Sequence, residues 1–196
     1  MLALTNPVTQ ARYPWPVILA SASPRRRELL ARLVPDFKID VADLDEEAFL
    51  VADPVKTAER LALAKALAVA VRNPQSVVIG GDTVVELGGR QFSKPRNTRD
   101  GIEMLMTLSG KQHRVISAVA LVWPEGRHVF SDIAKVSFRE LSAEEVATYV
   151  ATGEPMDKAG GYAIQGGASS FVVGLVGEIE TVIGLPVSTW PASRHF

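Results

Sequence analysis

The chain has 196 residues, 47% of them hydrophobic and 22% charged, with a formal net charge of −1 at pH 7. This composition is typical of one globular domain and excludes disordered, collagenous and coiled-coil proteins. The near-zero net charge provides no global positive field for binding nucleic acid or an anionic membrane, so any anion site must be local.

The absence of cysteine and the shortness of the apolar stretches bear on where the protein is located. Cysteine is absent, which excludes disulfides, thiolate metal sites and cysteine nucleophiles, and favours a reducing compartment such as the cytoplasm. The most apolar stretch, 61–71, contains Lys65 and is too short to cross a bilayer about 30 Å thick. Residues 1–16 are interpreted as a flexible lead-in without the features of a secretory signal, and residues 17–196 as a single domain.

Hydrophobic periodicity predicts strands and helices that alternate along the chain. The expected order is a strand at 17–20, a helix at 24–33, a strand at 37–41, a helix at 54–72, strands at 77–79, 83–87 and 90–92, a helix at 98–108, strands at 113–123 and 128–138, a helix reaching about 151, and an apolar run at 171–176. Such alternation, with hairpins, indicates an α/β fold whose mixed sheet is flanked by helices.

Local signals mark the ends of several elements. Ser23 is expected to cap the first helix, which then has proline at its first position. Gly88-Gly89 is typical of a tight hairpin turn, and Ser142 with Glu145 forms a capping box. No P-loop or dinucleotide-binding glycine motif opens a helix, so those two nucleotide folds are excluded.

The first candidate site is a basic turn at the start of the first helix. Ser21 and Ser23 precede Arg25 and Arg26, at a helix N-terminus whose free backbone N–H groups attract anions. The arginines oppose the helix dipole, at a cost of about 0.3 kcal/mol or more each unless a negative group lies nearby. A bound polyphosphate would supply that charge, and a solvated basic turn is the alternative.

Lys65 and Asp82 are the next candidates. Lys65 lies on the apolar face of the long helix, so it either extends to the edge of that face or reaches an anion bound in a cleft. Asp82 directly follows an apolar strand and Gly80-Gly81, which would place its carboxylate at the strand end, a common position for catalytic groups. The alternative for Asp82 is a turn residue that caps local N–H groups.

Three other polar residues complete the set. Lys94 precedes Pro95, which favours an extended backbone that projects the lysine; a lone exposed lysine is the alternative. Glu46, in an acidic turn, fits either a solvated charge or a role with metal or water. Gln165 lies in a glycine-bearing loop at 154–167, and its amide offers both a donor and an acceptor to a base edge.

These segments, in this order, resemble the motifs of the Maf family of nucleotide pyrophosphatases. The matching segments lie at 19–30, 81–85, 94–95, 108–110 with His113, 154–160 and 164–166. The resemblance implies a two-lobed α/β fold with a central cleft, similar to the inosine triphosphate pyrophosphatases. One segment, 177–181, departs from the usual family sequence.

The resemblance also implies roles for individual residues. The family's acid/base aspartate falls on Asp82, and its acidic active-site residue on Glu46, with Asp45 or Glu47 as alternatives. The phosphate-binding cations of the family fall on Arg26, Lys65 and Lys94. The positions that set base preference fall on Arg25, Thr83 and Gln165.

The implied activity is hydrolysis of a nucleoside triphosphate, dTTP or UTP rather than 7-methyl-GTP, to the monophosphate and pyrophosphate. Mg²⁺ or Mn²⁺ is the implied cofactor, with Asp82 and Glu46 as its protein ligands. A non-catalytic protein that binds nucleotides or a partner in cell division is the alternative. The sequence is compatible with a homodimer and does not fix the oligomeric state.

Overall fold

The computed structural model describes residues 13–191, so residues 1–12 of the expected lead-in lie outside the described part of the chain. The strands are β1 (Val17–Leu19), β2 (Lys38–Ile39), β3 (Val77–Leu87), β4 (Arg90–Phe92), β5 (Gln112–Trp123), β6 (Gly126–Phe138) and β7 (Val172–Val176). The α-helices are α1 (Pro24–Leu33), α2 (Pro54–Ala70), α3 (Thr98–Leu108), α4 (Ala143–Ala151) and α5 (Ile179–Ile183). The 3₁₀ turns are η1 (Glu46–Phe49), η2 (Glu154–Asp157), η3 (Ala159–Gly161) and η4 (Gly167–Phe171).

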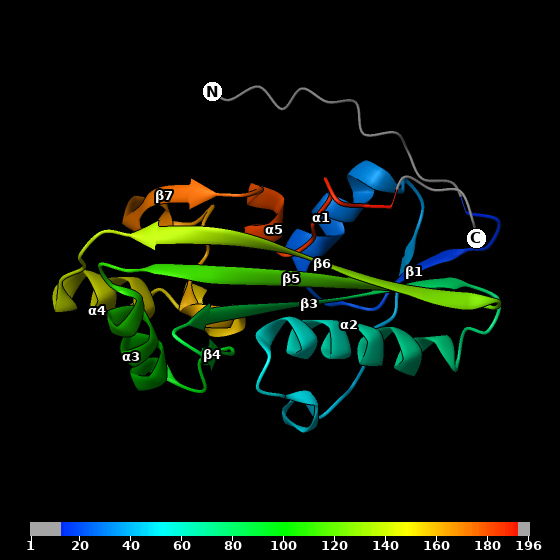
Figure 1. Ribbon diagram of the computed structural model, residues 1–196, viewed down its shortest axis with the longest axis horizontal. Helices are drawn as coiled ribbons and strands as arrows, with labels where there is room; N and C mark the ends of the chain where they lie inside the picture. Colours follow the sequence, from blue (N-terminus) through cyan, green and yellow to red (C-terminus); the bar gives the residue numbers. More distant parts are fainter. Residues whose placement is uncertain (1–12, 192–196) are drawn as a thin grey trace.

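The strands form one seven-stranded sheet, in which β2-β1-β3-β5-β6-β7 are neighbours and β4 pairs with β3. β1 is parallel to β2 and β3, and the other pairs are antiparallel. Figure 1 shows that β3, β5 and β6 run along the length of the molecule, with α2 on one face and α1 and α5 on the other. The α/β fold with a mixed sheet flanked by helices is therefore confirmed.

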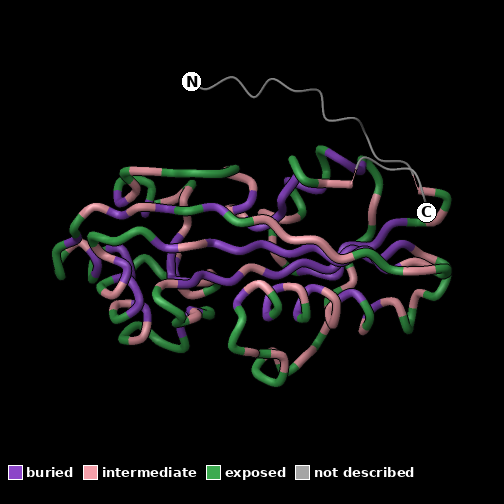
Figure 2. The backbone as a smooth tube through the Cα atoms, in the orientation of Figure 1, coloured by how far each residue is buried: buried purple, intermediate pink, exposed green. Residues whose placement is uncertain are grey.

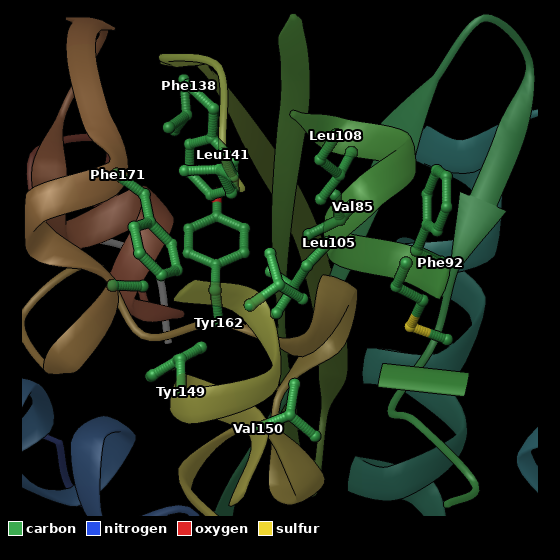
Figure 3. Packing of buried hydrophobic residues seen from close by; sticks show 14 of the residues in the cluster. Val85, Phe92, Leu105, Leu108, Phe138, Leu141, Tyr149, Val150, Tyr162 and Phe171 are labelled. Carbon is green, nitrogen blue, oxygen red and sulfur yellow. The ribbon is translucent and has the colours of Figure 1, made fainter. Parts of the chain in front are cut away.

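One lobe of the molecule has an aromatic core. Phe138, Tyr149, Tyr162 and Phe171 pack edge to face, with ring centroids 4.9–6.1 Å apart, between α3, α4 and the adjoining ends of β3, β5 and β6. Figure 3 shows Tyr162 at the centre of this packing. Edge-to-face rings add specific attraction to the burial of apolar surface, so this lobe has a rigid core of its own.

The other lobe has two cores, one on each face of the sheet. Leu30 of α1 packs against Ile79 and Leu121 on one face, and the alanines of α2, such as Ala62 and Ala66, pack on the opposite face. In Figure 2 the central strands are buried along most of their length, as expected for strands covered on both faces.

The local start and stop signals act as expected. Ser23 caps α1 by accepting a hydrogen bond from the backbone N–H of Arg26, and both hydrogen bonds of the Ser142–Glu145 capping box are present. Gly88 and Gly89 have φ of 59° and 87°, the left-handed conformations that a tight hairpin requires.

Several boundaries differ from the expectation. β2 is limited to Lys38–Ile39, because it is an edge strand that pairs only with the short β1. α2 ends at Ala70 rather than 72, and β6 begins at Gly126 because it pairs directly with Trp123 across a short turn. The loop at 154–167 is largely folded into 3₁₀ turns. Among the described residues, no helix is both long and apolar enough to cross a membrane.

β3 runs without interruption through Gly80 and Gly81, although the two glycines predicted that it would end before Asp82. β5 pairs with β3 along this whole stretch, and the continuous ladder outweighs the low strand propensity of glycine. The two glycines allow close approach instead. A Cβ at Gly80 would lie 2.2 Å from the carbonyl oxygen of Ala62, and one at Gly81 would lie 3.0 Å from Nε of Arg26. The placement of Asp82 at a strand end is therefore wrong.

Gly80→Ala is expected to lower the free energy of unfolding by about 3 kcal/mol, at the upper end of the usual cost of overpacking. The added methyl group would meet the backbone of α2 at Ala62 and at the Ala66 N–H, which cannot rotate away as a side chain can. Gly101→Ala is the matched control, because a Cβ there has ordinary contacts of 3.6 Å or more and alanine favours helix. Urea denaturation of both variants measures the difference. Equal stabilities would show that α2 does not depend on this close approach.

Candidate active site

A cavity of about 1070 Å³ lies between the two lobes. Ten residues singled out in the sequence line it: Ser21, Ser23, Arg25, Arg26, Glu46, Lys65, Asp82, Thr83, Lys94 and Gln165. They come from the segment between β1 and α1, from α1, η1, α2 and β3, and from the segments after β4 and η3, and the fold brings them all to one place. Their chemical roles stay predictions.

The cavity opens at a gap in the pairing of β3. On the side away from β5, β1 pairs with residues 77–79 of β3 and β4 pairs with residues 85–87. Among the described residues no strand pairs with 80–84 on that side. Asp82 and Thr83 follow each other in this gap, so their side chains point to opposite faces of the sheet, and both line the cavity. Asp82 therefore reaches the cavity from an unpaired stretch inside β3 and not, as predicted, from the end of a strand.

Lys65 lies between two carboxylates. Its Nζ is 2.7 Å from Oδ1 of Asp82 and 2.8 Å from Oε1 of Glu46, and the side chains of Lys65 and Asp82 are only 12% and 10% exposed. Close packing of α2 on Gly80 brings the lysine to β3. Lys65 does not extend to the edge of its helix face, because it is paired with the protein's own carboxylates inside the cavity. Its binding of a ligand anion stays a prediction. The turn-capping alternative for Asp82 is wrong, because the residue lies within a strand and bonds to Lys65.

The two carboxyl groups have opposite pKa shifts. Burial raises the pKa of Asp82 above its ordinary value, although the charges of Lys65 and Arg26 act in the opposite direction. Burial also acts to raise the pKa of Glu46, but the hydrogen bond and charge of Lys65, with Lys94 and Arg26, leave it below its ordinary value. Two neighbouring carboxyl groups with divergent pKa values are typical of a catalytic site, in which the group with the raised pKa exchanges protons more readily near neutral pH.

Arg26 is held on three sides. Its Nε donates to the carbonyl oxygen of Gly184 at 2.9 Å, Nη1 donates to Oγ of Ser21 at 3.3 Å, and Nη2 donates to Oγ1 of Thr83 at 3.0 Å. A guanidinium has five N–H donors, so the side chain can still contact a ligand while its plane stays fixed. Planar, pre-oriented donors of this kind suit the oxygen atoms of phosphate groups.

The remaining expected residues lie around the cavity wall. Ser21 and Ser23 accept hydrogen bonds from the backbone N–H groups of Ser23 and Arg26, so they also stabilise the turn between β1 and α1. Arg25 lies 3.7 Å from Asp157 of η2, which reaches it from the other lobe. Lys94 and Gln165 are exposed. No role was predicted for Asp157, although the residue lies within the matching segment 154–160.

The oxygen atoms of Asp82 and Glu46 are the protein ligands expected for a divalent metal. Among residues 13–191 no cluster of three or more histidine, aspartate or glutamate side chains could hold an ion by itself. Mg²⁺ is commonly bound by one or two carboxylates together with substrate phosphates, so the donor set fits an ion that binds with a polyphosphate.

A family model and two relatives match most of this chain. The family model described as "Maf-like protein" matches residues 16–191. A dTTP/UTP pyrophosphatase of Aquifex aeolicus is 47% identical over 87% of this chain and 90% of its own length. A dTTP/UTP pyrophosphatase of Rhodospirillum rubrum is 50% identical over 93% of this chain and 88% of its own length. The resemblance to the solved structure of the Staphylococcus aureus Ham1 protein is weaker, with a TM-score of 0.43 and 15% identity over 62% of this chain and 71% of that one. The family model and the two relatives show that this chain belongs to the Maf family.

Proposed function

We propose that this protein hydrolyses nucleoside triphosphates, dTTP and UTP foremost, to the nucleoside monophosphate and pyrophosphate. The observation that carries the proposal is the buried carboxylate of Asp82 in a cavity whose wall also holds Arg26, Lys65 and Lys94. The names of the relatives, dTTP/UTP pyrophosphatases, support the same substrate class.

In the proposed reaction a water oxygen bonds to the α phosphorus, and the bond from that phosphorus to the bridging oxygen of pyrophosphate breaks. Asp82 takes the proton from the water. Its raised pKa suits this task, because a general base works best when its pKa lies close to the operating pH. Arg26, Lys65 and Lys94 bind the phosphates and stabilise the charge that develops on the departing pyrophosphate.

The proposed cofactor is Mg²⁺ or Mn²⁺, with Asp82 and Glu46 as its protein ligands. When bound, such an ion withdraws charge from phosphate oxygens and lowers the pKa of a bound water. The ammonium of Lys65 lies between the same two carboxylates. We therefore expect the triphosphate to draw Lys65 toward its own oxygens and to supply further ligands to the ion.

Base preference is assigned to Arg25, Thr83 and Gln165. All three line the cavity, and an arginine, a hydroxyl and an amide together offer donors and acceptors to a pyrimidine. A cytoplasmic location is proposed because the chain has no cysteine, as is common in reducing compartments.

The proposal is tested by a panel of triphosphates in the presence of Mg²⁺ or Mn²⁺, with pyrophosphate and orthophosphate measured separately. We expect the monophosphate and pyrophosphate as products, higher kcat/KM for dTTP and UTP than for 7-methyl-GTP, and loss of activity with a chelator. A diphosphate and orthophosphate as products would exclude the reaction. A tenfold preference for 7-methyl-GTP, equal to about 1.4 kcal/mol of transition-state binding, would exclude the substrate assignment. Tight nucleotide binding without turnover would favour the non-catalytic alternative.

A further inference from the structure

A row of polar side chains crosses the sheet beside the cavity. Thr83 of β3 pairs directly with Ser117 of β5, which in turn pairs directly with Asp132 of β6. Directly opposed residues in antiparallel strands project from the same face of a sheet. α5 packs on this face, and its Thr181 contacts both Ser117 and Asp132. Ser117 and Thr181 are fully buried, whereas Thr83 reaches the cavity.

The hydrogen bonds of this row can run in one direction only. The carbonyl oxygen of Thr181 can only accept, and Oγ of Ser117 donates to it at 2.7 Å. The single hydroxyl proton of Ser117 is thereby used, so Ser117 must accept from the hydroxyl of Thr83, whose Oγ1 is 2.9 Å away. Arg26 can only donate, and it donates to Thr83 at 3.0 Å. Thr83 therefore presents only lone pairs to Arg26 and to the cavity.

The short helix α5 accepts hydrogen bonds from both Arg26 and Ser117, the two residues that bond to Thr83. The carbonyl oxygen of Gly184, the C-cap of α5, accepts from Nε of Arg26, and that of Thr181 accepts from Ser117. Carbonyl groups at a helix C-terminus lack intrahelical partners, so they are free to accept such bonds. The hydroxyl of Thr181 donates to Asp132 and ties the helix to β6. The bond from Ser117 uses the main-chain carbonyl of Thr181, so this one bond does not depend on which side chain stands at position 181.

We propose that Ser117 is a positioning residue for the pyrophosphatase reaction, an inference that rests on the function proposed above. Ser117 acts through Thr83, because it accepts a hydrogen bond from the hydroxyl of Thr83 and so keeps a lone pair of that hydroxyl directed at Arg26. Without the Ser117 hydroxyl, the Thr83 side chain is free to rotate and donate a hydrogen bond to the bound triphosphate. When the Thr83 side chain rotates away from Arg26 to reach the triphosphate, Arg26 loses one of the three hydrogen bonds that hold its guanidinium in a fixed orientation.

The test begins with Ser117→Ala, which is expected to lower kcat for UTP about tenfold while KM stays equal or falls. A freed Thr83 proton adds a hydrogen bond to the bound triphosphate, whereas a loosened Arg26 stabilises the transition state less. Ser117→Thr keeps a hydroxyl in the row and is expected to retain more of kcat than Ser117→Ala, although its added methyl group in a buried position lowers stability. Steady-state kinetics and melting curves of both variants separate the two effects.

Thr83→Val tests the row from its other end. Ser117 and Thr83 act through one chain of hydrogen bonds, so Ser117→Ala with Thr83→Val is expected to be no slower than Thr83→Val alone. Ser131→Ala is the matched control, because Ser131 is a serine of β6 that donates to Glu59 outside the row. Its kcat is expected to stay within twofold of the wild-type value.

Two results would overturn the inference while leaving the proposed function intact. One is a folded Ser117→Ala protein whose kcat lies within twofold of wild type, or a double variant in which the two effects multiply. The other is a fall of kcat in Ser117→Ala and Ser117→Thr that follows only their loss of stability, which would indicate a structural role. Failure of the wild-type protein to release pyrophosphate would instead refute the proposed function, and the inference with it.

Discussion

Asp82→Asn is expected to lower kcat by about 10²- to 10⁴-fold, the usual effect of removing a general base. Asparagine has the same shape but cannot take a proton. Lys65 retains its ion pair with Glu46, so the variant is expected to fold. Nucleotide affinity measured without a divalent metal, and so without turnover, should stay the same or rise, because a negative charge beside the polyphosphate has been removed.

Single-turnover rates and equilibrium binding of UTP measure these two effects separately. In the wild type, kcat/KM should fall as the pH falls through the pKa of Asp82, which burial places above the ordinary aspartate value, because only the ionised carboxylate can accept a proton. That acid limb should be absent from the variant. Asp40→Asn is the matched control, since Asp40 pairs with Arg72 outside the cavity. Near-normal turnover of a folded Asp82→Asn protein would refute the assigned base and favour Glu46 or a metal-bound hydroxide.

Lys65→Met is expected to lower kcat/KM by about 10³-fold, through weaker binding as well as slower chemistry. The lysine attracts phosphate oxygens in the ground state and in the transition state. Its loss also leaves the buried Asp82 without its closest cation, which raises the pKa of that carboxyl further and removes part of the base at neutral pH. Measured nucleotide affinity should therefore fall, in contrast to Asp82→Asn.

Stability offers an independent check on the same pair. Lys65→Met removes one partner of the buried Lys65–Asp82 ion pair and is expected to lower the free energy of unfolding by about 2 to 3 kcal/mol. The double variant Lys65→Met with Asp82→Asn removes both charges and should regain much of that stability without regaining activity. An unchanged affinity for UTP in Lys65→Met would contradict the assignment of Lys65 to phosphate binding.

Local elements were largely predictable because short-range stereochemistry determines them. The cap at Ser23, the capping box at Ser142 and the Gly88-Gly89 hairpin depend on backbone groups only a few residues away, and all three are confirmed. Membership of the Maf family was likewise evident from motifs in order, and the family model and relatives confirm it. The catalytic roles assigned from those motifs stay predictions for the variants above.

The surroundings of the site could not be predicted, because they depend on pairing between distant segments. The Gly80-Gly81 pair predicted the end of a strand, yet β3 continues through both glycines because β5 pairs with it there. The position of Lys65 between two carboxylates depends on how closely α2 packs on Gly80. Ser117 gave no signal in the sequence, since a serine within an apolar strand becomes informative only when its register with Thr83 is known.

The sequence by itself therefore determined the alternation of helices and strands, the family, and the ten polar residues that line one cavity. The helices and strands are encoded in contiguous segments through capping and turn geometry. The family and the cavity residues were found through contiguous motifs that resemble those of the Maf family. Only the tertiary structure decided that Asp82 and Thr83 lie in a gap of strand pairing between β1 and β4, and that Ser117 of β5 pairs with Thr83. The reason is that strand register is set by long-range hydrogen bonds and by burial of both faces, neither of which a local pattern encodes.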